Sequence, residues 1–200
     1  MINIAAISFS RGNQQIYQEF SAQIAKGEAV LLTGPNGSGK STLLQLIGGL
    51  LKPESGHIEI DGVKVGNLST REQAQARSIA PQRRSFTLAF SVGEVLNFLP
   101  KRLRVADNSG IIARLGLREL LERKVTELST GEQERVSLAL ALSQRANYYL
   151  LDEPFSGQDS ESSSQILELI TELKREKGVL VISHNQDAFS LYFDRAISLA

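Results

Sequence analysis

The chain is 200 residues long, contains no cysteine, and carries 22 basic and 22 acidic side chains, which gives a formal net charge of zero. A chain of this length buries a core without disulfide or metal support, and its balanced charge argues against a protein dedicated to nucleic acid, which is normally basic. We expect neither a signal peptide nor a membrane-spanning helix, because no apolar run approaches the roughly 18 residues that cross a bilayer. Composition therefore predicts one globular domain that reaches a membrane only through a partner.

The first half of the chain predicts strands of two kinds. The segments INIAAISFS at 2–10 and HIEIDG at 57–62 are followed by turn-forming residues and suit a small antiparallel layer. Between them, AVLLTG at 29–34 is almost continuously apolar, as is typical of a parallel strand that is buried on both faces. Helical periodicity begins soon after that strand and covers residues 41–51.

The second half predicts alternating helices and strands. Helical periodicity at 129–144 and 162–177 flanks the apolar run NYYLLD at 147–152, and a third apolar run, GVLVIS, follows at 178–183. The serines at 162–164 are expected to cap the last helix and Gly178 to end it. Between about residues 85 and 125 the pattern predicts a mostly helical insertion.

The stretch GPNGSGKST, which follows the first apolar run, is a Walker A phosphate loop: Gly34, four residues, then Gly39, Lys40 and Ser41. Glycines allow successive backbone N–H groups to turn toward a phosphate, Lys40 supplies a positive charge for the β- and γ-phosphates, and the Ser41 hydroxyl suits Mg²⁺. A glycine-rich turn that only caps a helix is the alternative, but the strand before the loop and the helix after it favour nucleotide binding. The residues expected to hold the nucleotide are Gly34, Pro35, Asn36, Gly37, Ser38, Gly39, Lys40, Ser41 and Thr42.

An acidic pair ends the second apolar run, in the stretch YYLLDEP. Asp152 is expected to hold Mg²⁺ through water, and Glu153 to polarise the water that attacks the γ-phosphate. Alone, such a pair more often begins a loop or caps a helix. Together with a phosphate loop, it predicts a phosphoryl-transfer site.

The segment ELSTGEQERVSLALAL at 127–142 resembles the signature motif of the ATP-binding cassette (ABC) ATPases, which is usually written Leu-Ser-Gly-Gly-Gln. Three further residues match the family in order: Gln82 the Q-loop glutamine, Asp159 the D-loop aspartate and His184 the switch histidine. The resemblance extends from about residue 4 to residue 199. It implies an α/β P-loop NTPase with a mainly parallel core sheet, an antiparallel β layer and a helical subdomain. Residues 1–84 and 126–200 would form the core with its antiparallel layer, and residues of about 85–125 the subdomain.

The resemblance also implies a dimer in which two cassettes clamp two ATP molecules head to tail. Ser129 and Gly131 would then contact the γ-phosphate bound by the facing subunit, and Asp159 would lie at the seam between the subunits. Gln82 would touch Mg²⁺ or the attacking water, and His184 would hydrogen-bond the γ-phosphate. With Lys40 and Glu153 these residues imply ATP hydrolysis rather than a scaffold that only binds ATP.

Some positions depart from the usual family pattern. Thr130 and Glu132 replace the first glycine and the glutamine of the signature, and Gln158 stands where the D-loop commonly has leucine, which predicts a more polar seam.

In the family an aromatic residue before the phosphate loop stacks on adenine. By its spacing from the loop, that position falls near Arg11 in this chain. Phe9 and Tyr17 remain alternatives, so the residue that contacts the base stays open. The chain ends sixteen residues after His184, which predicts either a minimal cassette or a truncated one.

The expected partners are a second cassette and separate membrane-spanning subunits, which would dock near Gln82 to Val92. Of the apolar side chains there, Phe86, Leu88, Phe90 and Val92, we expect about half to fill a local core. The chain would then be a peripheral ATPase on the cytoplasmic face of the membrane, and this stretch is similar to that of importers of metal chelates (siderophores, haem or cobalamin). The short C-terminal end is instead similar to small cassettes of haem-exporter type. A soluble ABC ATPase that acts on ribosomes or DNA is the alternative, which the zero net charge disfavours.

Overall fold

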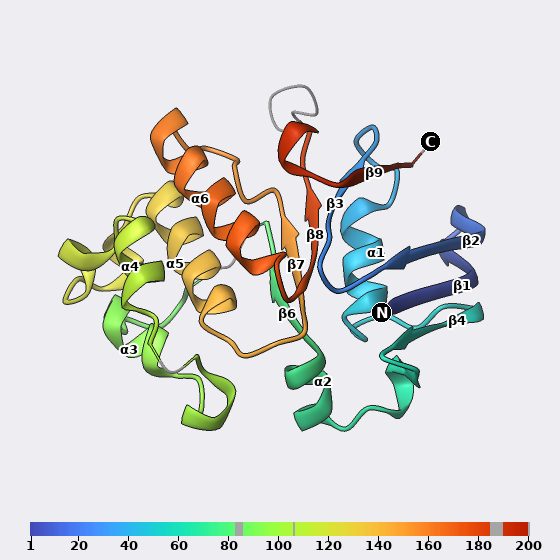
Figure 1. Ribbon diagram of the computed structural model, residues 1–200, viewed down its shortest axis with the longest axis horizontal. Helices are drawn as coiled ribbons and strands as arrows, with labels where there is room; N and C mark the ends of the chain where they lie inside the picture. Colours follow the sequence, from blue (N-terminus) through green and yellow to red (C-terminus); the bar gives the residue numbers. More distant parts are fainter. Residues whose placement is uncertain (83–85, 106, 185–189, 200) are drawn as a thin grey trace.

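A computed structural model describes residues 1–82, 86–105, 107–184 and 190–199. Within these ranges the strands form two sheets, and Figure 1 shows helix α1 (Lys40–Ile47) between them. The remaining larger helices cover the opposite face of the parallel sheet, on the left of the view. The predicted fold class, α/β with a parallel core sheet and an antiparallel layer, is confirmed.

The core sheet is parallel throughout, with the strand order β6-β7-β8-β3-β9. The three predicted strands lie side by side at its centre. The bounds are β3 Ala29–Thr33, β6 Arg77–Ala80, β7 Tyr148–Asp152, β8 Gly178–Ile182 and β9 Arg195–Ser198.

The antiparallel sheet has the order β2-β1-β4-β5, and β1 pairs with β4 so that Ile2 faces Ile60 and Ile4 faces Ile58. These isoleucines are buried and pack toward α1, because alternate side chains of a strand point to one face. The bounds are β1 Ile2–Arg11, β2 Gln14–Ile24, β4 Ser55–Ile60 and β5 Val63–Lys64.

The parallel sheet is buried on both faces, which explains its continuously apolar strands. Val30 and Leu32 of β3 pack with α1 and the antiparallel layer, whereas Ala29 and Leu31 pack with the helices on the other face. Those helices include α5 Thr130–Leu142 and α6 Ser160–Leu173.

The shorter helices are α2 Thr70–Ala76, α3 Val92–Asn97 and α4 Ser109–Arg114. Two of them, α3 and α4, fall within the predicted helical insertion, and 3-10 turns at Lys101–Leu103 and Arg118–Leu120 interrupt it. The helices of the insertion are therefore short, six residues each in α3 and α4. The division of the chain into a core and a subdomain stays a prediction.

Asp61, in the turn after β4, ties the antiparallel layer to the core sheet. Its carboxylate accepts hydrogen bonds from Lys26 Nζ at 2.8 Å, Asn147 Nδ2 at 3.1 Å and the Tyr148 hydroxyl at 2.8 Å. Partial burial alone would raise the pKa of Asp61, but the bonds from Lys26, the N-terminal amine and Tyr148 outweigh it and hold the pKa well below its usual range.

Two predictions about the last helix are wrong. Asp159 caps α6, because its carboxylate accepts a hydrogen bond from the Ser162 backbone N–H at 2.7 Å, so the serines at 162–164 are already helical. The helix ends at Leu173, and Gly178 instead opens β8. A Cβ on Gly178 would lie 2.4 Å from the Tyr148 ring, so close packing between strands requires this glycine.

Among the residues that the structure describes, no helix is both long enough and apolar enough to cross a bilayer.

Candidate functional site

The predicted phosphate loop lies between the end of β3 and the start of α1, and its glycines have backbone angles that favour glycine. The φ angles are +143° at Gly34, +86° at Gly37 and +97° at Gly39. Lys40 is buried, and its Nζ donates hydrogen bonds to the carbonyl oxygens of Gly34 and Pro35, both at 2.8 Å. The lysine ammonium group is therefore folded over the loop.

Helix α1, like the six-residue helix α4, has no side-chain cap from its N-cap residue, whereas α2, α3, α5 and α6 have one. Ser69, Ser91 and Ser129 each cap their helix through a reciprocal capping box with a glutamate three residues later. Gly39 precedes α1, and no side chain among the described residues caps its first turn. Free N–H groups at a helix N-terminus, together with the helix dipole, favour an anion.

Asp152 is the last residue of β7 and is only 8% exposed. Its Oδ1 atom is buried without a hydrogen-bond partner among the described residues, and the Ser41 hydroxyl lies beside the carboxylate. Burial raises the pKa of Asp152, and Ser41, Lys40 and His184 offset part of that shift. A buried carboxylate oxygen without a partner beside a hydroxyl is an arrangement that a hard cation would complete.

Glu153 follows in a strained conformation, with a φ angle of +53° that is uncommon outside glycine. Its Oε1 atom lies 3.1 Å from His184 Nε2, and the glutamate side chain is 9% exposed whereas the histidine is about half exposed. Burial raises the pKa of Glu153, the charge and backbone N–H of His184 lower it, and Asp152 raises it further. The result is a carboxyl group that takes up a proton more readily than a glutamate in water.

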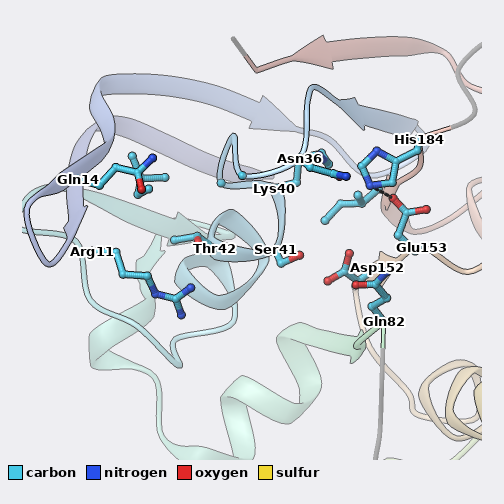
Figure 2. Close-up of a pocket in the computed structure, with 14 residues that line it drawn as sticks. Arg11, Gln14, Asn36, Lys40, Ser41, Thr42, Gln82, Asp152, Glu153 and His184 are labelled. Atoms are coloured by element: carbon cyan, nitrogen blue, oxygen red, sulfur yellow. Dashed lines mark ion pairs between the residues drawn. The ribbon is translucent and has the colours of Figure 1, made fainter.

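These side chains surround one cavity of about 360 Å³, which Figure 2 shows in close-up. Gln82, Asp152, Glu153 and His184 lie on one side of the phosphate loop, and Arg11 and Gln14 lie on the other. The lining residues are Arg11, Gln14, Ile16, Asn36, Gly37, Gly39, Lys40, Ser41, Thr42, Gln82, Asp152, Glu153, Ile182 and His184.

Six of the predicted site residues do not line this cavity: Gly34, Pro35 and Ser38 of the phosphate loop itself, and Ser129, Gly131 and Asp159 from elsewhere in the chain. Ser129 is engaged in the capping box of α5, where it donates to Glu132 Oε2 at 2.7 Å, and Gly131 belongs to the first turn of that helix. Asp159 caps α6. One chain therefore brings together only part of the residue set that the sequence predicts around a nucleotide.

Gln158 joins this second group of residues. Its Oε1 accepts a hydrogen bond from Arg135 Nη1 at 3.1 Å, and its Nε2 donates to the Gly131 carbonyl at 3.4 Å. The loop before α6 is thus fastened to the first turns of α5.

The structure separates the three candidates for contact with a base. Arg11 lines the cavity, whereas Phe9 is only partly buried and packs against the core cluster around α1. Tyr17 is 4% exposed, and its hydroxyl donates to the Gly39 carbonyl at 2.8 Å, so its ring is not available for stacking. The sequence also gave no signal for Gln14 and Ile16, which line the cavity because β2 brings them there.

Comparison with known proteins identifies relatives across nearly the whole chain. A family model described as ABC transporter matches residues 17–156. A hemin import ATP-binding protein of Bordetella avium is 35% identical over 97% of this chain and 80% of its own length. A manganese transport system ATP-binding protein of Bacillus subtilis is 32% identical over 96% of this chain and 80% of its own length. A petrobactin import ATP-binding protein of the same organism is 29% identical over 100% of this chain and 83% of its own length.

Solved structures match the fold over the complete chain. A bacterial ABC transporter cassette solved as a dimer superposes with a TM-score of 0.84 at 26% identity, covering 100% of this chain and 94% of its own. The same cassette in a post-hydrolysis dimer bound to ADP and Pi superposes with a TM-score of 0.83 at 25% identity and the same coverage.

The buried Glu153 carboxylate predicts a change in stability that requires no ligand. Its raised pKa means that the ionised side chain costs stability at neutral pH, so the neutral variant Glu153→Gln should be more stable. We expect its melting temperature at pH 7 to lie about 2–4 °C above that of the unsubstituted protein, as about 1 kcal/mol gives in a domain of this size. The difference should vanish as the pH falls below about 4.3, where the carboxyl is protonated in both states.

The matched control is Glu119→Gln, because Glu119 is an exposed glutamate. Its melting temperature should be unchanged at pH 7. A melting temperature of Glu153→Gln equal to or below that of the unsubstituted protein at pH 7 would contradict the electrostatic cost assigned to Glu153.

Proposed function

The chain belongs to the ABC transporter family as an ATP-hydrolysing subunit, and we propose that two copies close around two ATP molecules and thereby drive membrane-spanning partners. One observation carries this proposal. The cavity is lined by Lys40, Asp152 and Glu153, whereas Ser129 and Gly131, at the start of α5, do not line it. A second subunit would supply the missing part of each site.

The phosphates of ATP would bind at the N-terminus of α1. The free N–H groups of its first turn and the Lys40 ammonium both favour an anion there, and charged phosphate oxygens are stronger acceptors than the loop carbonyls that Lys40 now contacts. On the other side of the loop, Arg11 would lie against the base, since a guanidinium plane stacks on aromatic rings.

The site also fits Mg²⁺. The Ser41 hydroxyl and the unpartnered Asp152 Oδ1 are oxygen donors of the kind that Mg²⁺ prefers. No cluster of three or more His, Cys, Asp or Glu side chains suited to a metal occurs within the described ranges, so phosphate oxygens and water would complete the coordination. When bound, Mg²⁺ neutralises charge that develops on the phosphates.

Glu153 would act as the general base in hydrolysis. A water oxygen forms a bond to the γ-phosphorus, its proton passes to the Glu153 carboxylate, and the bond from the γ-phosphorus to the bridging oxygen of ADP breaks. His184, at 3.1 Å, would orient that carboxylate and contact the γ-phosphate, and Gln82 would position the water or the cation. The raised pKa of Glu153 makes its carboxylate a better proton acceptor than a glutamate in water.

The facing subunit would contribute Ser129, Gly131 and Asp159. The two solved relatives that are dimers support this arrangement. Within each chain, Gln158 would move the segment at Asp159 together with the start of α5, because it bonds to both Gly131 and Arg135.

The membrane-spanning subunits would dock on exposed apolar side chains of the segment that follows Gln82. Of the side chains expected there, Val92 is buried and Phe86 packs against the core, whereas Leu88 is 63% exposed and Phe90 is 46% exposed. Phe98, at the end of α3, is 81% exposed. Residues 83–85 of the predicted docking segment lie outside the described residues. Large apolar side chains exposed together favour a protein interface.

The substrate we propose is a metal ion or a metal chelate taken into the cell. Relatives of this chain serve hemin, petrobactin and manganese transport, as their names state. The chain would then work at the cytoplasmic face of the membrane, held there by its membrane-spanning partners.

The substitution Glu153→Gln tests the hydrolytic site. It retains the size of the side chain but removes the base, so the turnover number should fall at least about 100-fold while ATP affinity stays within about threefold. Steady-state phosphate release and equilibrium binding of ATP measure the two quantities, with Glu161→Gln on the exposed start of α6 as control. Undiminished turnover in Glu153→Gln would remove Glu153 from this role.

The substitution Phe98→Asp tests the docking face. A charge on this face should abolish co-purification of the chain with its membrane-spanning subunits in detergent, while ATP hydrolysis by the isolated chain stays unchanged. Leu50→Asp is the matched control, because Leu50 is 69% exposed after α1, on a different part of the surface. Equal recovery of the complex with Phe98→Asp and Leu50→Asp would contradict docking at this face.

A further inference from the structure

Tyr17 makes an unusual contact beneath the phosphate loop. It belongs to β2 in the antiparallel layer, is 4% exposed, and donates its hydroxyl hydrogen to the carbonyl oxygen of Gly39 at 2.8 Å. Burial raises the pKa of Tyr17, so the hydroxyl stays protonated and remains a donor throughout the physiological pH range.

The Gly39 carbonyl is held at the start of α1 by two donors. It accepts the first hydrogen bond of the helix, from the Leu43 backbone N–H at 2.8 Å, and the bond from Tyr17. A carbonyl oxygen has two lone pairs, so both bonds can be made at once. Their combination fixes the plane of the peptide between Gly39 and Lys40.

This peptide plane determines where the Lys40 N–H points. A trans peptide is planar, with its carbonyl and its N–H pointing in opposite directions, and the structure has no cis peptide among the described residues. Because the Gly39 carbonyl points toward α1 and Tyr17, the Lys40 N–H points away from them, beyond the N-terminus of the helix. Both Gly39 and Lys40 line the cavity.

The fit between β2 and the loop is close. A Cβ on Gly39 would lie 2.4 Å from Ile16 Cγ2 and 2.9 Å from the Tyr17 hydroxyl. Gly39 is therefore required both for its φ angle of +97° and for the space that Ile16 and Tyr17 occupy. The loop rests directly on side chains of the antiparallel layer.

We propose that Tyr17 is a positioning residue for phosphate binding, which acts by orienting the peptide between Gly39 and Lys40 so that the Lys40 N–H faces the nucleotide phosphates. The proposal rests on the proposed function, since it assumes that this loop binds nucleotide. The antiparallel layer would then have two functions. It would provide Arg11 beside the base, and it would set the geometry of the phosphate loop through Tyr17.

The consequence is a specific loss of affinity in Tyr17→Phe. The ring stays in place, and the Gly39 carbonyl keeps its bond from Leu43, so no buried acceptor is left without a partner. The affinity for ATP and for ADP should each fall about fivefold, the size expected when one hydrogen bond is lost. The turnover number at saturating ATP should stay within about twofold, because the contact serves bound substrate and transition state alike.

Tyr149→Phe provides a matched control. Tyr149 is 2% exposed, and its hydroxyl likewise donates to a backbone carbonyl, that of Gln144 at 2.7 Å, in a part of the chain that does not line the cavity. Both variants lose one buried tyrosine hydroxyl bond, so their melting temperatures should fall by similar amounts. Only Tyr17→Phe should weaken nucleotide binding.

Isothermal titration with ATP and with ADP, run on the unsubstituted chain and on both variants, decides the matter. The proposal is overturned if Tyr17→Phe binds both nucleotides as tightly as the unsubstituted chain, or if Tyr149→Phe loses as much affinity. Amide hydrogen exchange over residues 38–42 is a second measurement, in which ADP should protect this segment less in Tyr17→Phe. Failure of the unsubstituted chain to bind ATP would instead refute the proposed function.

Discussion

The rest of the structure depends on one constraint, the uncapped backbone N–H groups at the start of α1. The helix lies between two sheets, and a helix end in such a place must satisfy its N–H groups. Side chains do this for α2, α3, α5 and α6, but none among the described residues does it for α1. The phosphate loop leaves these donors to a ligand, and the glycines, the buried lysine and the tyrosine beneath the loop all serve that purpose.

The carboxyl ends of the parallel strands place a second constraint beside the first. Because β3, β7 and β8 are adjacent and parallel, the phosphate loop, the acidic pair and His184 all emerge at one edge of the sheet. Burial there raises the pKa of both Asp152 and Glu153, so the folded chain holds two carboxylates at an electrostatic cost. Ser41, Lys40 and His184 offset part of that cost, and a bound cation would offset more. The chain therefore loses some folding stability at Asp152 and Glu153, the two residues proposed to act in hydrolysis.

Much of this arrangement was predictable from short patterns in the sequence. Continuously apolar runs identify β3, β7 and β8, since only strands covered on both faces have that composition. The sequence patterns do not identify β2, β5, β6 and β9. Strands β5, β6 and β9 have only two to four residues each, and β2 carries many polar residues on its exposed face. The cap of α6 was misassigned because serine and aspartate are both good caps, and only the backbone geometry decides between them.

The phosphate loop and the acidic pair were found because their chemistry fixes both residue type and spacing. Tyr17 was not assigned its observed place, because its contact with Gly39 joins β2 to a loop that lies more than twenty residues further along the chain. The separation of Ser129 and Gly131 from the cavity follows from the fold rather than from the motif itself. Under the proposed function, that separation means that one chain provides only half of each nucleotide site.

The most direct test of this central claim is an ATP-dependent disulfide between two chains. The sequence has no cysteine, so Asn36→Cys in the phosphate loop and Thr130→Cys at the start of α5 can be introduced into a Glu153→Gln chain without background. A disulfide requires Cα atoms within about 7 Å, so it reports contact between the two motifs. We expect a covalent dimer under oxidising conditions with ATP and Mg²⁺, and none without nucleotide. A chain that stays monomeric in both conditions would contradict a nucleotide site shared between two chains.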